Sequence, residues 1–253
     1  MEPSRRPLSA VLQLAAALAF AAVWGWLALN GLPGGMTAPL DLSRFAYPFG
    51  ALSLLTFSVA ALALAKVGMM AWRWHRSGRI SDPTALPFGL ALAAASLWPF
   101  VLNSAPALAA AVVGLQLLLA LTALGQSDDE WRRRRLRLSQ MSGASAHLRL
   151  LRIAPVAVFA GWSIAVGGSL LSVLIQDQFG FSPVLATVLG LVAIAALAVV
   201  AQLAAARTPE LSLAVIWALI GTAASQIGTD LPATLMAVAG VSLLAAGIVQ
   251  IAS

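Results

Sequence analysis

No charged residue occurs in PTALPFGLALAAASLWPFVLNSAPALAAAVVGLQLLLALTALGQS, which is residues 83–127 of the chain. A membrane-spanning helix needs about 20 apolar residues, because each residue rises ~1.5 Å and the hydrocarbon core is about 30 Å thick. This stretch is therefore too long for one span. Pro106, which cannot donate a backbone hydrogen bond, follows Asn103 and Ser104 near its middle and predicts a tight turn there. We expect a helical hairpin that crosses a membrane twice.

The rest of the chain has the same character. It is 60% hydrophobic and only 9% charged, whereas about a quarter of the residues in soluble domains are charged. We therefore predict an all-α fold, a polytopic membrane helix bundle with about eight transmembrane helices that forms a single integral-membrane domain over residues 1–253. The expected spans are residues 8–30, 47–72, 84–102, 105–125, 152–176, 183–206, 209–227 and 231–251.

The basic residues predict the orientation of these helices, since cytoplasmic loops carry an excess of Lys and Arg. If the N-terminus is cytoplasmic, all but one of the 15 basic residues fall on that side, including Lys66 near the end of its helix, and only Arg44 lies outside. This distribution requires an even number of spans. We expect a multi-pass protein of the bacterial inner (cytoplasmic) membrane with both termini in the cytoplasm.

The first predicted helix has an alternative interpretation as a cleaved secretory signal. Arg5 and Arg6 form a basic start, an apolar segment follows, and Ala19-Phe20-Ala21 fits a cleavage site. The apolar stretch continues well past that site to Asn30, which is longer than a signal requires. We therefore favour a retained helix.

The longest predicted loop, residues 126–151, is basic and divides the chain into two four-helix halves. A run of arginines could indicate a nucleic-acid patch, but next to a membrane helix it is more typical of contact with anionic lipid, at ~1 kcal/mol for each arginine. We therefore expect membrane lipids and no nucleic acid as partners of this segment. The residues expected to contact anionic lipid are Arg132, Arg133, Arg134, Arg135 and Arg137.

The polar inventory disfavours several classes of function. The chain has no cysteine, its two histidines (His75 and His147) lie in basic segments, and all nine acidic residues fall in loops or at helix ends. Ion-coupled transporters keep an ionisable group inside the bundle, and intramembrane hydrolases need paired acids or a metal. We expect no catalytic residues, no metal site and no enzyme activity.

The eight tryptophans fall into two groups by their expected depth. Five lie near helix ends and fit the interfacial aromatic belt, in which case they report only on membrane position. Three lie deeper and are either packing anchors or walls of a ligand pocket, because a buried indole needs a partner for its N–H. The belt residues are Trp24, Trp26, Trp72, Trp74 and Trp131, and the deeper ones are Trp98, Trp162 and Trp217.

Two segments carry a resemblance to a known family. RIAPVAVFAGW (residues 152–162) and TPELSLAVIWALIG (residues 208–221) resemble helices of the tryptophan-rich sensory proteins, the TspO/MBR or translocator-protein family, in its longer eight-helix bacterial branch. The second predicted helix departs from that family in AYPFGALSLLT (residues 46–56). Tyr47 and Phe49 match the family pattern, but Leu52 and Thr56 replace a Trp and a Tyr.

The resemblance implies a sensor or carrier that binds a planar apolar ligand in an aromatic-lined cavity, with porphyrin, haem or a sterol-like molecule as ligand and no other cofactor. The loss of two aromatic residues motivates an alternative, a non-catalytic structural or assembly subunit of a larger membrane complex that has lost the pocket. An uncoupled facilitator of a small apolar solute and a homodimer remain open. The residues that the resemblance places at the ligand are Tyr47, Phe49, Trp98, Asn103, Trp162 and Trp217.

Overall fold

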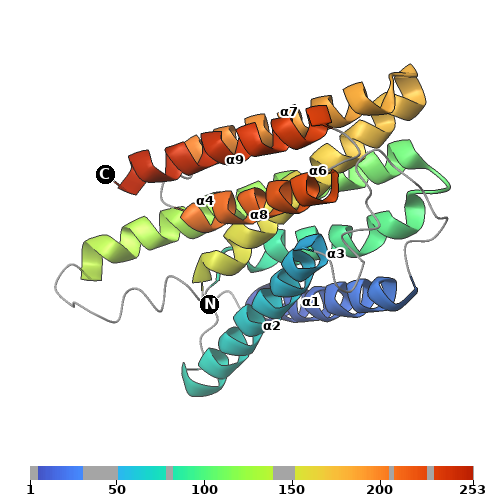
Figure 1. Ribbon diagram of the computed structural model, residues 1–253. Coiled ribbons are helices and arrows are strands. Elements are labelled where there is room, and N and C mark those ends of the chain that lie inside the picture. The colour runs from blue at the N-terminus through green and yellow to red at the C-terminus, as the bar shows by residue number, and fades with distance from the viewer. Residues whose placement is uncertain are drawn as a thin grey trace.

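The computed structural model describes residues 5–30, 51–77, 82–138, 152–204, 208–226 and 231–252, and all regular structure within these ranges is helical (Figure 1). The prediction of an all-α membrane helix bundle is confirmed, and each observed helix overlaps one of the predicted spans. They are α1 (Arg5–Asn30), α2 (Ala51–Ser77), α3 (Ala85–Val101), α4 (Pro106–Leu138), α6 (Ala154–Phe179), α7 (Pro183–Ala204), α8 (Pro209–Gln226) and α9 (Leu231–Ala252).

Five of these helices, namely α1, α2, α4, α6 and α7, are long and apolar enough to cross a membrane. In α3, α8 and α9 the apolar stretches found among the described residues are shorter, at residues 85–101, 209–224 and 234–245, and these helices pack against the rest of the bundle. Successive helices run in alternating directions along the bundle, so that α1 begins and α9 ends toward the same end, the left-hand end in Figure 1. The protein is therefore a multi-pass membrane protein.

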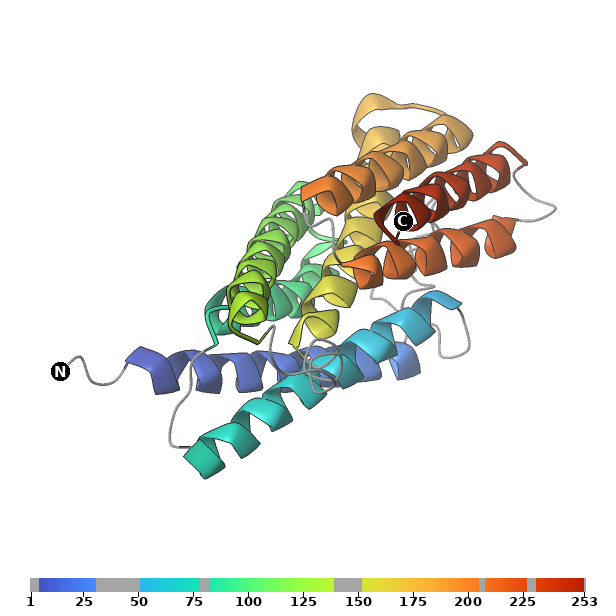
Figure 2. The ribbon, with the colours of Figure 1, turned by 90° about the vertical axis from the view of Figure 1, so that its left-hand side faces the viewer.

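Helix α6 is the centre of the bundle. It packs against α2, α4, α7 and α8, and Figure 2 shows it between α4 on one side and α8 on the other. Of its membrane-length window 72% is buried, against 28–39% for the other four long helices. A helix that is apolar on all sides is stable in this position because other helices cover every face.

Small residues let α6 approach its neighbours closely. A Cβ atom on Gly161 would lie 2.7 Å from the carbonyl oxygen of Leu211 and 2.8 Å from the Cβ of Ala214, both on α8. A Cβ atom on Gly168 would lie 2.9 Å from the carbonyl oxygen of Gly190 on α7. Backbone atoms cannot move aside as a flexible side chain can, so these positions require glycine.

We expect Gly161→Ala to destabilise the protein by about 1–3 kcal/mol, because overpacking forces α6 and α8 apart. Gly114 on α4 is a matched control, since it is exposed and nothing lies within 4 Å of an added Cβ. There the same substitution should stabilise by about 0.5–1 kcal/mol, because alanine loses less backbone entropy in a helix. Thermal unfolding in detergent micelles measures both, and equal shifts in the two variants would contradict the close α6–α8 contact.

One boundary differs clearly from the prediction. Helix α4 continues to Leu138, so the expected loop over residues 126–151 is helical in its first half, including the arginine run. Arg, Leu, Glu and Gln are strong helix formers, and the acidic residues at 128–130 stand three or four positions before arginines. The charges end the membrane span but do not end the helix. Residues 139–151 lie outside the described ranges.

Candidate functional site

Six aromatic side chains from α1, α3 and α6 meet inside the bundle and form what we call the aromatic cluster. Each is less than 2% exposed, so the cluster is closed to the surroundings in this structure. All six belong to one continuous hydrophobic core. The members are Phe20 and Trp24 of α1, Phe88 and Trp98 of α3, and Phe159 and Trp162 of α6.

Trp24 connects the two other tryptophans of the aromatic cluster. Its ring centroid lies 5.7 Å from that of Trp98 and 5.3 Å from that of Trp162, to which it is nearly perpendicular at 87°. Phe159 stacks on Trp162 at 5.7 Å, and Phe20 meets the same indole edge-on at 5.4 Å. Offset and edge-to-face contacts of this kind contribute about 0.5–1.5 kcal/mol each beyond area burial. The cluster therefore ties three helices together.

The three indole N–H groups of the aromatic cluster differ in their hydrogen bonding. Trp24 Nε1 donates to the carbonyl oxygen of Ala95 at 3.3 Å, and Trp162 Nε1 donates to Thr56 Oγ1 of α2 at 2.9 Å. Trp98 Nε1 is buried without a partner among the described residues. An unsatisfied buried donor costs about 1–3 kcal/mol, so such a group needs an explanation.

Buried amides add further hydrogen-bonding capacity to the bundle interior. Gln116 Nε2 of α4 donates to Ser163 Oγ of α6 at 2.8 Å, while Gln116 Oε1 has no partner in the described part of the chain. Neither amide atom of Gln13 is paired there, although Gln13 is fully buried where α1 approaches Gly89 of α3. The interior thus combines aromatic faces with unused polar groups.

A buried ion pair lies at the N-terminal end of α3. Lys66 is only 2% exposed, and its Nζ lies 2.8 Å from Asp82 Oδ2. Asp82 Oδ1 accepts hydrogen bonds from the backbone N–H and the hydroxyl of Thr84, at 3.0 and 2.6 Å. Burial alone would raise the pKa of the Asp82 carboxyl, but the Lys66 charge and the hydrogen bonds from Lys66 and Thr84 together hold that pKa below its ordinary value.

This pair corrects the expected position of Lys66. We expected it near the end of its helix, whereas α2 continues for three more turns to Ser77. The helix extends past the start of α3, so Lys66 lies beside Asp82 in the segment that leads into α3. The bundle therefore does contain a desolvated charge, and Asp82 compensates it.

The structure brings together two of the six residues that the resemblance places at the ligand. Trp98 and Trp162 both belong to the aromatic cluster and are joined through Trp24. Asn103 lies exposed in the turn between α3 and α4, and Trp217 is 47% exposed on the outer face of α8. Tyr47 and Phe49 lie outside the described residues.

Four members of the aromatic cluster were missed by the sequence reasoning. Trp24 was assigned to the interfacial belt, but it is 1% exposed, whereas Trp26 two positions later is 47% exposed as a belt residue should be. Depth along a helix does not reveal which way a side chain faces. The signal was the helical spacing of buried positions in α1, which are Gln13, Ala16, Ala17, Phe20, Trp24 and Leu27.

Two comparisons with known proteins found no relative, and a third identified the family. The chain matches none of the curated proteins and none of the solved structures with which it was compared. The family described as TSPO-like protein matches residues 49–251, a range that spans α2 to α8 and all of α9 except its last residue. The match covers most of the chain and contains both segments that carried the resemblance, so the protein belongs to the TSPO-like protein family.

Proposed function

We propose that the protein is a non-catalytic sensor or carrier that binds a planar apolar ligand, such as a tetrapyrrole, at the aromatic cluster. The observation that carries this proposal is the Trp98 indole, whose buried N–H has no partner among the described residues. A ligand with a hydrogen-bond acceptor at its edge would satisfy that donor. The two neighbouring indoles already have partners, so Trp98 is the member of the cluster that remains available.

The chemistry of the cluster suits a flat π-system. Ligand sites in proteins are mostly apolar with a few placed polar groups, and aromatic faces favour offset stacking with planar molecules. Three indoles and three phenyl rings supply the faces, and the Trp98 N–H supplies a directional contact.

Entry of a ligand requires the cluster to open, because all six rings are closed on one another. Helix α2 is the element best placed to move. It contacts the cluster through the hydrogen bond from Trp162 Nε1 to Thr56 Oγ1, which would have to break when α2 moves away from α6. The ligand would then stabilise an open arrangement by binding it better than the closed one.

Titration with protoporphyrin, followed by the Soret absorbance of the porphyrin, tests the proposal without depending on tryptophan fluorescence. We expect a saturable spectral shift for the wild type. Trp98→Phe should weaken the apparent affinity roughly fivefold to tenfold, since the loss of one hydrogen bond costs about 1–1.5 kcal/mol. Trp217→Phe, at an exposed indole, is the matched control and should leave the affinity unchanged.

Two results would count against ligand binding at the cluster. One is a wild-type titration that rises linearly with porphyrin, as partition into the micelle does. The other is an equal loss of affinity in Trp98→Phe and Trp217→Phe, which would place the ligand elsewhere.

A second function is favoured by the closed packing of the cluster itself. The six rings are buried against one another and leave no room for a ligand in the closed arrangement. Thr56, which replaces a family tyrosine, accepts a hydrogen bond from Trp162 Nε1. These features suit a structural or assembly subunit of a larger membrane complex. For such a protein the porphyrin titration should show no saturable shift while the protein purifies in mild detergent with other membrane proteins in fixed stoichiometry.

A further inference from the structure

Gln13 of α1 is a polar side chain that lies inside the bundle without a hydrogen-bond partner in the described part of the chain. It is 0% exposed, and neither its Nε2 donor nor its Oε1 acceptor is paired there. Each unsatisfied buried group costs about 1–3 kcal/mol, so an amide with both atoms unused calls for a functional explanation.

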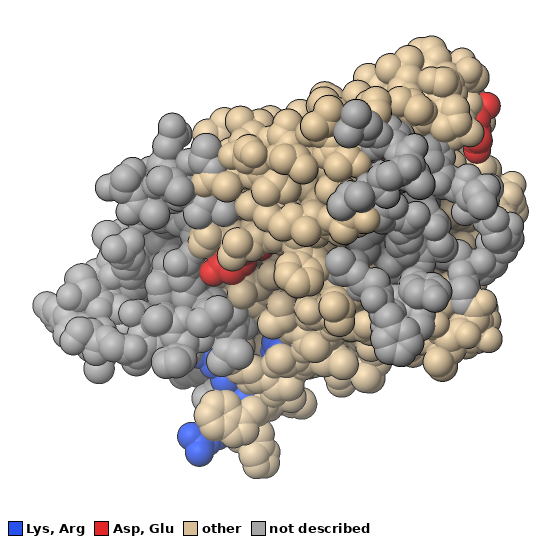
Figure 3. Space-filling view, in the orientation of Figure 1, with Lys and Arg blue, Asp and Glu red and all other residues tan. Residues whose placement is uncertain are grey.

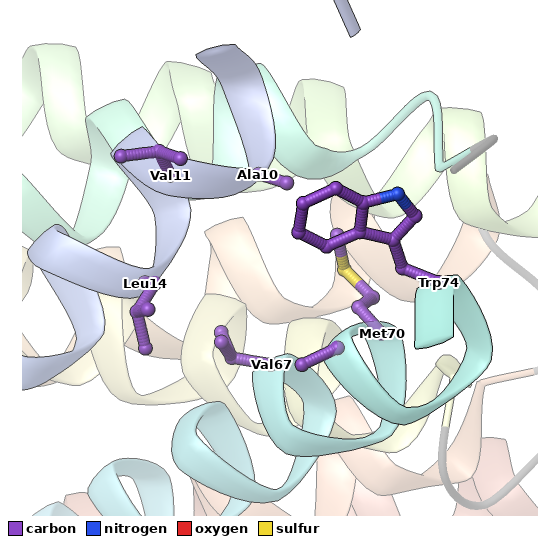
Figure 4. A pocket seen from close by; sticks show the side chains of 7 residues that line it. Ala10, Val11, Leu14, Val67, Met70 and Trp74 are labelled. Atoms are coloured by element: carbon purple, nitrogen blue, oxygen red, sulfur yellow. The ribbon is translucent and has the colours of Figure 1, made fainter. Parts of the chain in front are cut away.

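Gln13 lies on the side of α1 that faces α3. The side of this part of α1 that is turned to α2 carries Ala10, Val11 and Leu14, which line an apolar cavity of about 100 Å³ together with residues of α2 (Figure 4). Gln13 is not one of the residues that line this cavity. It packs instead on Gly89 of α3, where an added Cβ atom would lie 3.1 Å from Gln13 Cα.

Gln13 marks the end of the aromatic cluster at which Phe88 lies. Phe88 immediately precedes Gly89, the residue of α3 that packs on Gln13. On α1, Gln13 precedes Phe20 by seven residues, which is about two helical turns, so both side chains belong to the buried face of that helix. The buried residues between them on this face are alanines, at positions 16 and 17. Helix α1 therefore places no bulky side chain between Gln13 and the rings.

Trp98 lies at the opposite end of the cluster. It follows Phe88 by ten residues along α3, or ~15 Å, and its indole N–H has no partner among the described residues. An indole only donates a hydrogen bond, whereas an amide both donates and accepts. A ligand that lies along the cluster would thus meet one donor at one edge and a donor with an acceptor at the other edge.

The charges of the bundle favour a neutral group at Gln13. Lys66 is the one buried cation among the side chains that the structure describes, and Asp82 compensates its charge at 2.8 Å. Figure 3 shows Lys and Arg side chains of one face gathered at the lower left, where α2 ends. An ionised carboxylate beside Gln13 would find no uncompensated cation among these buried groups, and an unpaired buried charge is very costly. A neutral carboxyl group instead carries an O–H donor and a carbonyl acceptor, which match the amide atoms Oε1 and Nε2.

We propose that Gln13 binds a carboxylic acid group at one edge of the ligand, so that the ligand is a planar apolar carboxylic acid. The carboxyl O–H donates to Gln13 Oε1, Gln13 Nε2 donates to the carboxyl C=O, and the opposite edge accepts from Trp98 Nε1. Protoporphyrin, a flat ring with carboxyl side chains on one edge, is a molecule of this class. The role of Gln13 rests on the proposed function, because the cluster must open to admit the ligand. Gln13 lies in α1, which precedes the residues 49–251 that match the family, so the contact is inferred from this chain alone.

Titration of the detergent-purified protein with protoporphyrin and with its dimethyl ester, followed by the Soret absorbance, tests this proposal. The ester keeps the flat ring and the carbonyl acceptors but has no carboxyl O–H. We expect both porphyrins to saturate the wild type, with the acid bound roughly fivefold to tenfold more tightly, as one hydrogen bond of about 1–1.4 kcal/mol gives. Gln13→Met keeps a similar side-chain length without the amide, so this variant should bind acid and ester equally.

Gln202→Met is the matched control. Gln202 Nε2 of α7 is also buried without a described partner, but it packs where a Cβ atom on Gly247 of α9 would lie 3.0 Å away, and neither helix contributes to the cluster. This variant should keep the wild-type preference for the acid. The free energy of unfolding separates recognition from a structural role. Gln13→Met should be at least as stable as the wild type, because it replaces an unsatisfied amide by an apolar group of similar shape.

The outcomes distinguish this proposal from the proposed function. The role of Gln13 is overturned if the saturated wild type binds the ester as tightly as the acid, or if Gln13→Met keeps the preference, while ligand binding itself then stands. It is also overturned if Gln13→Met is less stable than the wild type, because the amide would then have a partner inside the protein. If neither porphyrin gives a saturable shift, the proposed function fails and the role of Gln13 fails with it.

Discussion

Replacing Lys66 with methionine is expected to lower the free energy of unfolding by about 3–5 kcal/mol, because it leaves the Asp82 carboxylate buried without its counter-charge. Lys66 is 2% exposed and its ammonium lies 2.8 Å from the carboxylate, so water cannot replace it. The pair joins α2 to the start of α3, and its loss should loosen that contact first. Unfolding in mixed micelles, followed by circular dichroism, gives the free energy.

A second substitution distinguishes the ion pair from simple packing. The double variant Lys66→Met with Asp82→Asn contains no buried charge, and replacing both members of a buried pair is often neutral. It should therefore recover most of the lost stability. Arg76→Met, an exposed cation on the same helix, is the control and should cost less than about 1 kcal/mol. A double variant that is less stable than Lys66→Met alone would show that the pair is not the cause.

The same pair predicts how stability depends on pH. The pKa of Asp82 in the folded protein lies below its ordinary value, because the Lys66 charge and the hydrogen bonds outweigh burial. A carboxylate with a depressed pKa stabilises the fold fully above its unfolded value, about 3.9, and loses this contribution as the pH falls through the folded pKa. The wild type should thus lose stability in acid, and the double variant should lose less.

The membrane spans could be predicted from the sequence because the length of an apolar stretch is a property of the chain alone. The fifth and sixth predicted spans, residues 152–176 and 183–206, became α6 and α7 with almost the same limits. The end of α4 could not be predicted in this way. Charges mark where the membrane ends, but the arginine run is also a good helix former, so the helix continues to Leu138.

The candidate site was harder to predict, since it depends on which face of each helix is covered. Trp217 and Trp162 lie at similar depths from the starts of their helices, yet one is 47% exposed and the other fully buried. The Lys66–Asp82 pair likewise depends on α2 extending past α3, which no local pattern reveals. Helical spacing within α1 did indicate a buried face, and it would have identified Trp24.

Trp24 and Trp26 offer the sharpest test of the aromatic cluster, because they are two residues apart on α1 and differ almost only in the direction they face. Trp24→Ala should destabilise the protein by about 3–5 kcal/mol, as expected for the truncation of a buried aromatic side chain that leaves a cavity. The substitution also removes the contacts with Trp98 and Trp162 and the hydrogen bond to the carbonyl oxygen of Ala95.

Trp26→Ala should cost far less, at most about 1 kcal/mol, because that indole is 47% exposed. Trp24→Phe keeps an aromatic ring but loses the N–H donor, so it should fall between the two. The free energies of unfolding of the three variants, measured in the same micelles, give this order. Similar values for Trp24→Ala and Trp26→Ala would mean that Trp24 is an interfacial residue and does not stabilise the cluster. The expected order instead means that α1 holds the cluster closed through Trp24. A ligand that opens the cluster must then overcome the contacts of Trp24 as well as the hydrogen bond between Trp162 and Thr56.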